Sequence, residues 1–66
     1  MKAVLKIKQY RVMRDLSTTE LARKVNVAQG YISDIENGNK FPSIPLLCHI
    51  AKALSCKPGE LIECEE

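Results

Sequence analysis

Small polar side chains recur on one face of the segment from residue 29 to residue 37, and the chemistry they offer is hydrogen bonding. The residues of this face are Gln29, Gly30, Ser33, Asp34 and Asn37. Ile32 and Ile35 fall on the opposite face at helical spacing. A rigid pair of short helices that leaves one polar helix projecting is a device that fits the DNA major groove. The pattern therefore predicts a nucleic-acid-binding surface on this segment.

Residues that could support catalysis or hold a metal are few. His49 is the single histidine, and Cys48, Cys56 and Cys64 recur at every eighth position. Structural zinc sites use cysteine pairs that are about two to four residues apart, and this chain has no such pair. A glycine-rich phosphate loop is also missing. We therefore expect no enzyme, metal or cofactor, and a surface position for His49; metal or redox sensing by the cysteines is the less favoured alternative.

The length of 66 residues suits one domain with a small core, here expected over residues 1–66. The formal net charge is +2, with basic residues concentrated in 2–14 and acidic residues in 60–66. This asymmetry fits an oriented field toward a nucleic acid, and it fits equally a solvated helix face with a solubilising tail. No apolar run approaches the ~20 residues that span a bilayer. Residues 1–5 do not form a signal peptide, so we expect a cytoplasmic protein with reduced thiols.

Apolar periodicity and capping residues predict five helices that would position the polar face. Their expected ranges are residues 3–14, 18–25, 29–36, 44–54 and 59–62. The apolar stripe of the first helix would be Val4, Leu5, Ile7, Val12, Met13 and Leu16. Ser17 and Glu20 form a capping-box pattern, and Ser43 is placed to cap the fourth helix. Asp15 and Asn26 tolerate the left-handed conformation of helix ends. The fold class predicted is all-α, with an acidic tail over residues 63–66.

Residues spread along most of the chain match the pattern of a known family. They are Leu16, Ser17, Glu20, Leu21, Ala22, Val25, Val27, Ile32, Ser33, Ile35, Glu36, Asn37, Gly38, Pro42, Ser43, Leu47, Ile50, Ala51, Lys52, Ala53, Leu54, Glu60 and Leu61. On these residues the chain resembles the Cro and phage-repressor (XRE, lambda-repressor-like) family over residues 4–62. The resemblance implies a compact five-helix lambda-repressor-like domain with its helix-turn-helix at helices 2 and 3. It also implies that Cys48 and Cys56 are buried core residues, while Cys64 would lie in the tail.

The resemblance further implies roles for individual residues. The base-reading positions would be Ala28, Gln29, Gly30, Ser33 and Asp34. The phosphate contacts would come from Thr18, Thr19, Tyr31, Asn37, Asn39 and Lys40. Arg11 and Glu36 match an ion pair that links the first helix to the third. Gln29 can bind adenine through two hydrogen bonds, and Ala28 can contact a thymine methyl group. Tyr31 either reaches a phosphate with its hydroxyl or covers the core with its ring.

The chain departs from the family pattern at a few of these positions. Thr18 replaces a common glutamine, which weakens a side-chain phosphate contact there. Ala28 replaces a common serine or threonine, so the third helix would lack its usual cap. Asp34 would repel phosphate, although it could accept a hydrogen bond from cytosine.

Together these features predict a sequence-specific DNA-binding transcriptional regulator. We expect a repressor that binds double-stranded DNA as a homodimer on a two-fold related operator, without a membrane or small-molecule ligand. One alternative is a protein-interaction module that uses the same fold without DNA, and another is an antitoxin or restriction–modification controller. The dimer contact is expected in the carboxyl-terminal part, with Leu61 and Ile62 as candidates unless they belong to the core.

Overall fold

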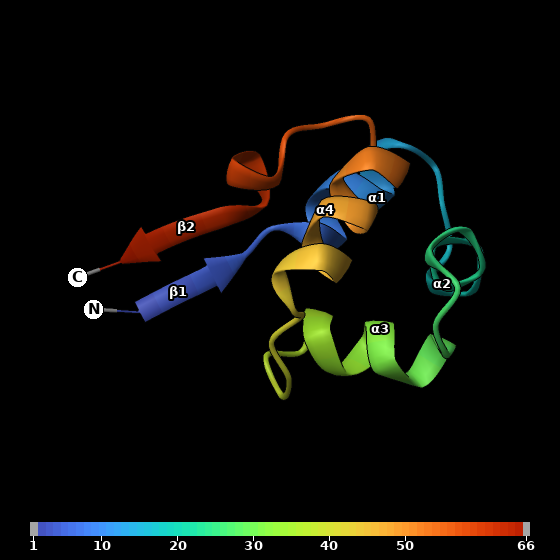
Figure 1. The fold of residues 1–66 in the computed structure, drawn as a ribbon, viewed down its shortest axis with the longest axis horizontal. Coiled ribbons are helices and arrows are strands. Elements are labelled where there is room, and N and C mark those ends of the chain that lie inside the picture. The colour runs from blue at the N-terminus through green and yellow to red at the C-terminus, as the bar shows by residue number, and fades with distance from the viewer. Residues whose placement is uncertain (1, 66) are drawn as a thin grey trace.

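The computed structural model describes residues 2–65 and, within them, the side chains of residues 4–63. Along the chain lie strand β1 (Lys2–Leu5), helices α1 (Ile7–Met13), α2 (Thr18–Val25), α3 (Gln29–Glu36) and α4 (Ile44–Ala53), a 3₁₀ helix (Pro58–Leu61) and strand β2 (Ile62–Glu65). The helices pack together, and the two strands form a ribbon that projects to one side of them (Figure 1). The expectations for the side chains of Cys64 and Glu65, and for Glu66, lie outside the described residues.

Helix α2 begins and ends where its capping residues predict. The Ser17 hydroxyl accepts a hydrogen bond from the Glu20 amide at 3.0 Å, and the Glu20 carboxylate accepts one from the Ser17 amide at 3.0 Å. The Ser17 amide also lowers the pKa of Glu20, because it bonds the ionised carboxylate. Asn26 ends the helix in the left-handed conformation with φ of 62°. The predicted range 18–25 is therefore confirmed, together with its physical reason.

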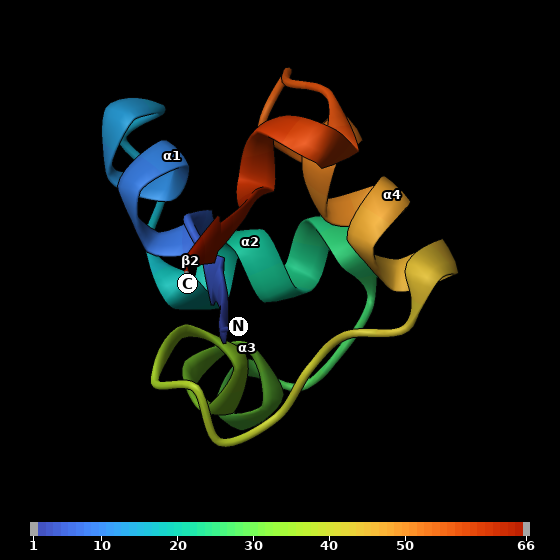
Figure 2. The same ribbon diagram turned by 90° about the vertical axis from the view of Figure 1, so that its left-hand side faces the viewer.

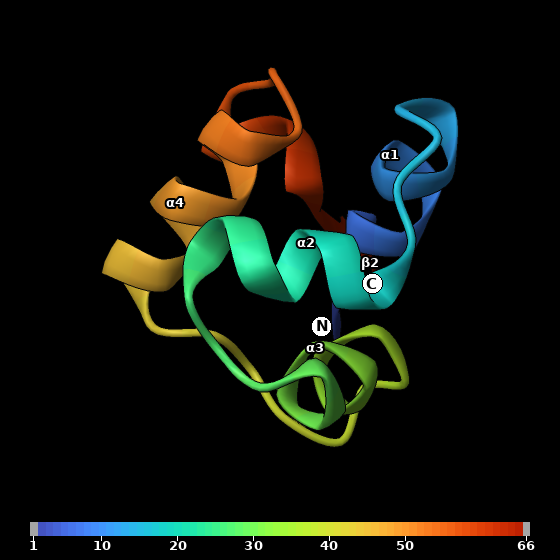
Figure 3. The same cartoon turned by 90° about the vertical axis from the view of Figure 1, so that its right-hand side faces the viewer.

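The predictions for α3 and α4 are also confirmed, to within one residue. Helix α3 spans Gln29–Glu36, and Ala28 supplies no side-chain cap at its start. Ser43 caps α4 by accepting a hydrogen bond from the Leu46 amide at 3.3 Å. Figure 3 shows α2 lengthwise and α3 almost end-on beneath it, so the two helices cross at a large angle. This crossing leaves one side of α3 uncovered.

The predicted first helix is wrong over its amino-terminal part. Residues 2–5 form β1, which pairs antiparallel with β2 so that Leu5 stands opposite Ile62. The Lys6 amide then donates to the Leu61 carbonyl at 2.7 Å, and α1 starts at Ile7. Apolar residues at this spacing suit a strand as well as a helix, and a partner strand from the other end of the chain decides the outcome.

The fifth helix and the all-α class are corrected as well. In residues 2–65 there are four α-helices, one 3₁₀ turn over Pro58–Leu61 and a two-stranded sheet. Pro58 and Gly59 disfavour a longer helix at this point. The segment expected to be a tail supplies β2 instead, because its pairing with β1 satisfies backbone groups that a frayed tail would leave to water.

The core collects buried side chains from every helix. They are Ile7, Leu21, Ala22, Val25, Ile32, Ile35, Leu47, Ile50, Ala51, Leu54 and Leu61. Burial of each large apolar side chain contributes about 1.5–3 kcal/mol. Val12 and Met13 were expected in the core but are 60% and 66% exposed, because α1 ends at Met13 and buries only Ile7. This small core holds the α2–α3 pair in place.

Candidate nucleic-acid interface

The uncovered face of α3 presents a short hydrogen-bonded network. The Gln29 side-chain nitrogen donates to the Ser33 hydroxyl at 2.9 Å and to the Thr18 hydroxyl at 3.2 Å. Thr18 belongs to the first turn of α2, so the network joins the two helices of the helix-turn-helix. Both N–H groups of the Gln29 amide have partners, whereas its oxygen remains an open acceptor. A bidentate contact to adenine would require one N–H to exchange its hydroxyl partner for the base.

The other predicted base-reading positions share this face. Ala28 and Gly30 are exposed, and Ser33 and Asp34 are half-buried. A methyl group added at Gly30 would meet no protein atom within 4 Å. Gly30 is therefore not needed for packing within the domain, and the space above it is open to an approaching ligand.

The amino end of α2 lies beside this network. Thr19 is exposed, and Thr18 is half-buried through its place next to Gln29. First-turn amides of a helix lack intrahelical partners, and the capping box occupies that of Glu20. The amides that precede Glu20 are thus placed to receive an anion such as a phosphate. The side-chain contact of Thr18 with Gln29 gives no signal in the sequence, because the two residues are 11 positions apart and meet only when the helices cross.

The loop after α3 brings together the other predicted phosphate-contacting residues. Asn37, Asn39 and Lys40 are exposed. The loop folds back because the Asp34 carbonyl accepts hydrogen bonds from the amides of Asn39 at 2.8 Å and Lys40 at 3.3 Å. Gly38 permits the turn with φ of +81°, a conformation that disfavours a side chain. The loop therefore has a defined shape that presents one cation and two amides.

The Lys40 ammonium group has two close neighbours within the domain. It lies 3.7 Å from the Asp34 carboxylate and 5.4 Å from the centre of the Tyr31 ring. Tyr31 is half-buried and packs on the core, so its ring has the covering position considered from the sequence. The Asp34 side chain is directed to Lys40 instead of standing alone on the outer face. An exposed pair of this kind is weak and can separate when a phosphate competes for the ammonium group.

Arg11 and Glu36 tie the end of α3 to α1. The Arg11 Nε–Glu36 Oε2 distance is 2.7 Å, and the Arg11 Nη2–Glu36 Oε1 distance is 3.2 Å. Arg11 Nη1 also donates to the Leu16 carbonyl at 2.7 Å. The two side chains are only 12% and 6% exposed. This bidentate pair sets the direction of α3 and takes no part in the outer face.

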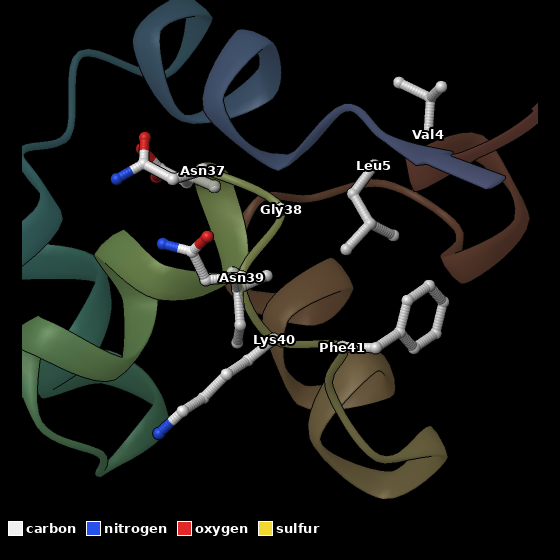
Figure 4. A pocket seen from close by; sticks show the side chains of 9 residues that line it. Val4, Leu5, Asn37, Gly38, Asn39, Lys40 and Phe41 are labelled. Carbon is white, nitrogen blue, oxygen red and sulfur yellow. The ribbon is translucent and has the colours of Figure 1, made fainter. Parts of the chain in front are cut away.

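A groove of about 480 Å³ runs between β1 and the loop after α3. Figure 4 shows Leu5 directed toward this loop, with Phe41 at the rim. The lining residues are Val4, Leu5, Ile35, Glu36, Asn37, Gly38, Asn39, Lys40 and Phe41. A smaller hollow of about 280 Å³ lies between α2 and α4, lined by Lys24, His49, Lys52 and Ala53.

The cysteines do not form a site among the described side chains. Cys48 is exposed, so the expectation that it is a core residue is wrong; the buried side of α4 is formed by Leu47, Ile50 and Ala51. Cys56 packs partly against the core, and its burial, followed by the nearby Glu60, raises the pKa of its thiol. His49 is exposed as predicted. Within residues 4–63 no three potential metal ligands come together.

No helix of the described chain has the length and apolar character needed to cross a bilayer.

Comparisons with known proteins give matches over most of the chain. A family model described as helix-turn-helix matches residues 7–61. The HTH-type transcriptional regulator MJ0272 of Methanocaldococcus jannaschii is 34% identical over 61 residues, which cover 92% of this chain and 92% of the relative. The HTH-type transcriptional regulator YozG of Bacillus subtilis is 37% identical over 51 residues. That match covers 76% of this chain but only 61% of the relative. Both relatives are described as uncharacterized.

A solved structure adds a likeness in three dimensions. SinR of Bacillus subtilis, described as the master regulator for biofilm formation, has been crystallised in complex with DNA. The TM-score to that structure is 0.77 with 38% sequence identity, and the match covers 82% of this chain and 87% of that chain.

Proposed function

The chain belongs to the helix-turn-helix family of Cro and phage-repressor type, and from this membership we propose that it is a sequence-specific DNA-binding transcriptional regulator. The observation that carries the proposal is the outer face of α3, where Gln29 is held between Ser33 and the first turn of α2. The likeness to DNA-bound SinR supports it. Chemistry at a substrate is not proposed, since this site offers hydrogen-bond donors and acceptors and no nucleophile with a base.

The proposed division of labour separates base reading from phosphate binding. The base-reading residues are Ala28, Gln29, Gly30, Ser33 and Asp34. The phosphate-contacting residues are Thr18, Thr19, Tyr31, Asn37, Asn39 and Lys40. Phosphate contacts supply affinity and its salt dependence, while the α3 face supplies selectivity. Lys40 exchanges Asp34 for a phosphate, and this leaves the Asp34 carboxylate free to accept from a cytosine amino group.

We further propose that the protein is a repressor that acts in the cytoplasm by occupying DNA that polymerase needs. Residues 1–66 act in this proposal as a single DNA-binding domain. Two copies bind a two-fold related operator on successive major-groove faces that are ~34 Å apart. Leu61 is withdrawn as a dimer contact, because its side chain is completely buried in the core. Ile62 is half-buried against the same core.

The best test is selection of bound duplexes from a random DNA pool, with the Gln29→Ala variant run in parallel. We expect an enriched half-site repeated with two-fold symmetry for the natural sequence. The Gln29→Ala pool should lose preference at one base pair of the half-site while keeping the others. Recovery of no enriched sequence by the natural protein would contradict the proposal.

A second candidate function is a protein-interaction module that does not bind DNA. The observation that favours it is the Asp34–Lys40 contact, which offsets positive charge beside the α3 face. Titration against mixed-sequence DNA at low and high salt separates the two functions. A DNA-binding protein loses affinity steeply with salt, whereas an interaction module shows no binding at either salt concentration. A role as an antitoxin or restriction–modification controller would keep the DNA-binding site, and neighbouring genes would define it.

A further inference from the structure

The smaller hollow, between α2 and α4, is a basic hollow. Lys24 lines it from the last turn of α2, and His49 and Lys52 line it from α4. His49 and Lys52 are three positions apart, so they lie on the same side of α4. The remaining lining residue, Ala53, has only a methyl side chain and leaves the space between these groups open. The basic hollow thus collects nitrogen donors from two helices around a volume of about 280 Å³.

The cations of the basic hollow have no acidic partner among residues 4–63. None of the ion pairs within this range includes one of its side chains. Helix α4 contains no carboxylate, and α2 contains only Glu20, whose carboxylate accepts the Ser17 amide in the capping box. Among the causes that lower the pKa of Glu20, the Ser17 amide is the largest and Lys24 is the smallest. The hollow therefore keeps a positive charge that an anion can neutralise.

The two lysines are not needed to complete the ends of their helices. After the last turn, α2 is followed by Asn26 and α4 by Ser55, both in the left-handed conformation. The next amide along the chain donates back to a carbonyl of the last turn, at 3.0 Å in α2 and 2.9 Å in α4. This arrangement is a Schellman motif, in which backbone amides satisfy the terminal carbonyls. The ammonium groups of Lys24 and Lys52 thus remain available to a ligand.

The basic hollow lies apart from the proposed DNA-binding surface. Among residues 4–63 its lining comes only from α2 and α4. Figures 2 and 3 view the molecule from opposite sides, and both show α4 beside the carboxyl end of α2 with α3 beneath α2. The proposed phosphate contacts Thr18 and Thr19 are in the first turn of α2, roughly 9 Å along the helix axis from Lys24. An anion in the hollow is therefore a different one from a phosphate held at that first turn.

We infer that the basic hollow binds the phosphate group of a small molecule. Ammonium groups and an imidazole N–H are donors that form strong hydrogen bonds with phosphate oxygens, and here they approach from two helices. The volume falls just below the usual range of small-molecule sites, which suits a phosphate with a small substituent. This ligand departs from the expectation, drawn from the sequence alone, that no small molecule binds. The inference is independent of the proposed function, because the hollow uses no residue of the α3 face.

The first experiment titrates inorganic phosphate into the ¹⁵N-labelled protein at constant ionic strength, with phosphate replacing chloride. We expect saturable chemical-shift changes at Lys24, His49 and Lys52, with half-saturation below about 10 mM. Lys8, which is exposed on α1, serves as the internal control and should not shift. Changes that do not saturate, or equal changes at Lys8, would show an adventitious ion only and would overturn the inference.

The second experiment compares two matched variants. Lys52→Gln and Lys8→Gln each remove one exposed cation from a helix and keep a side chain that favours helix formation. Lys52→Gln should raise the dissociation constant for phosphate by about fivefold or more, and Lys8→Gln should change it by less than about 1.5-fold. In chloride both variants should melt within about 2 °C of the natural protein, since surface changes have small effects. Equal effects on phosphate binding would overturn the inference.

A third measurement distinguishes a free ligand from an operator phosphate. The phosphate titration is repeated after the protein has been saturated with the selected duplex. Persistence of the shift changes at His49 supports a ligand other than the operator. Their complete loss would place the hollow within the DNA interface and would overturn the inference. If the protein binds no DNA but still binds phosphate in the hollow, only the proposed function fails.

Discussion

The inner and outer faces of α3 are held by contacts of different kinds. On the inner face Ile32 and Ile35 are buried, and Glu36 is joined to Arg11 at 2.7 Å with both side chains nearly enclosed. On the outer face the Lys40–Asp34 distance is 3.7 Å, and these two side chains are 57% and 40% exposed. Buried contacts cannot be exchanged for water without leaving unpaired polar groups, whereas exposed contacts can.

This difference explains how one short helix can be both rigidly placed and available for binding. The inner face anchors the helix axis, so the positions of Gln29 and Ser33 are set before any ligand arrives. The outer hydrogen bonds keep the side chains in order and exchange at small cost. If this comparison is correct, changes on the inner face should reduce stability, and changes on the outer face should reduce binding.

The largest expected effect is that of Glu36→Ala. It should lower the free energy of unfolding by about 3–5 kcal/mol, because the Arg11 guanidinium would be left nearly buried without its partner. The matched control is Asp34→Ala, which breaks the exposed pair on the same helix and should cost less than about 1 kcal/mol. Urea denaturation of both variants at pH 7 provides the measurement. Equal losses of stability in the two variants would show that the buried pair and the exposed pair do not differ in their contribution to folding.

Gln29→Ala should have the next largest effect, and it should appear in binding. We expect a loss of about 1–3 kcal/mol in affinity for the selected operator, with relaxed preference at one base pair. Stability should change by less than about 0.5 kcal/mol, since the site is exposed and alanine favours a helix. Fluorescence anisotropy with the selected duplex and single-base variants measures both quantities. Unchanged affinity and preference would show that Gln29 does not read DNA.

Lys40→Ala should weaken binding to every sequence by a similar factor. Its proposed partner is a phosphate, so the slope of log affinity against log salt should fall by about 1. Binding to the selected operator and to an unrelated duplex is measured from 50 to 200 mM salt, a range over which affinity that depends on phosphate contacts falls steeply. A loss confined to the operator would mean that Lys40 contacts or shapes a base edge, contrary to its assignment.

Thr18→Val should have a smaller effect on operator binding. It removes the hydroxyl that accepts from Gln29 and keeps the backbone amide that is proposed to face a phosphate. We expect a loss below about 1 kcal/mol, the usual range for one neutral hydrogen bond. In the Gln29→Ala background the same change should have no effect, and this double-mutant cycle isolates the contact. An undiminished effect in that background would assign Thr18 a role independent of Gln29.

The smallest effect concerns the exposed capping box of α2. Because the pKa of Glu20 is lower in the folded protein than its ordinary value of 4.5, its contribution to stability is complete above that value. The contribution is lost as the pH falls through the lower, folded pKa. Glu20→Gln should therefore show a weaker fall in melting temperature between pH 5 and pH 3 than the natural protein. Identical pH profiles would show that the carboxylate charge at this cap contributes nothing measurable.

Much of the helix-turn-helix unit could be predicted from local sequence. Ser17, Glu20 and Asn26 specify the ends of α2, and each acts on residues within one helical turn. The range of α3 follows in the same way from the spacing of Ile32 and Ile35. The roles assigned to residues on its outer face remain predictions. The contact between Gln29 and Thr18 could not be predicted, since it depends on how the two helices cross.

Residues 2–5 and 62–65 show where local reasoning fails. Val4 and Leu5 fit a helical stripe or a strand, and the choice depends on Ile62 and its neighbours almost 60 residues away. Val12, Met13 and Cys48 are apolar residues on helices, yet they are exposed because no other element packs on those sides. Apolar periodicity indicates which residues share one side of a helix. It does not indicate whether another element of the fold packs on that side.

The sequence by itself therefore determined the elements whose signals are short in range: α2, α3 and α4, their caps, and the polar character of the face that α3 presents. Tertiary structure alone decided the terminal ribbon, the exposure of Val12 and Met13, and the partners of Gln29 and Lys40. The physical reason is the range of the interactions. Capping bonds and helix periodicity act within a few residues of one another, whereas strand pairing, burial and contacts between helices exist only after distant segments have been brought together.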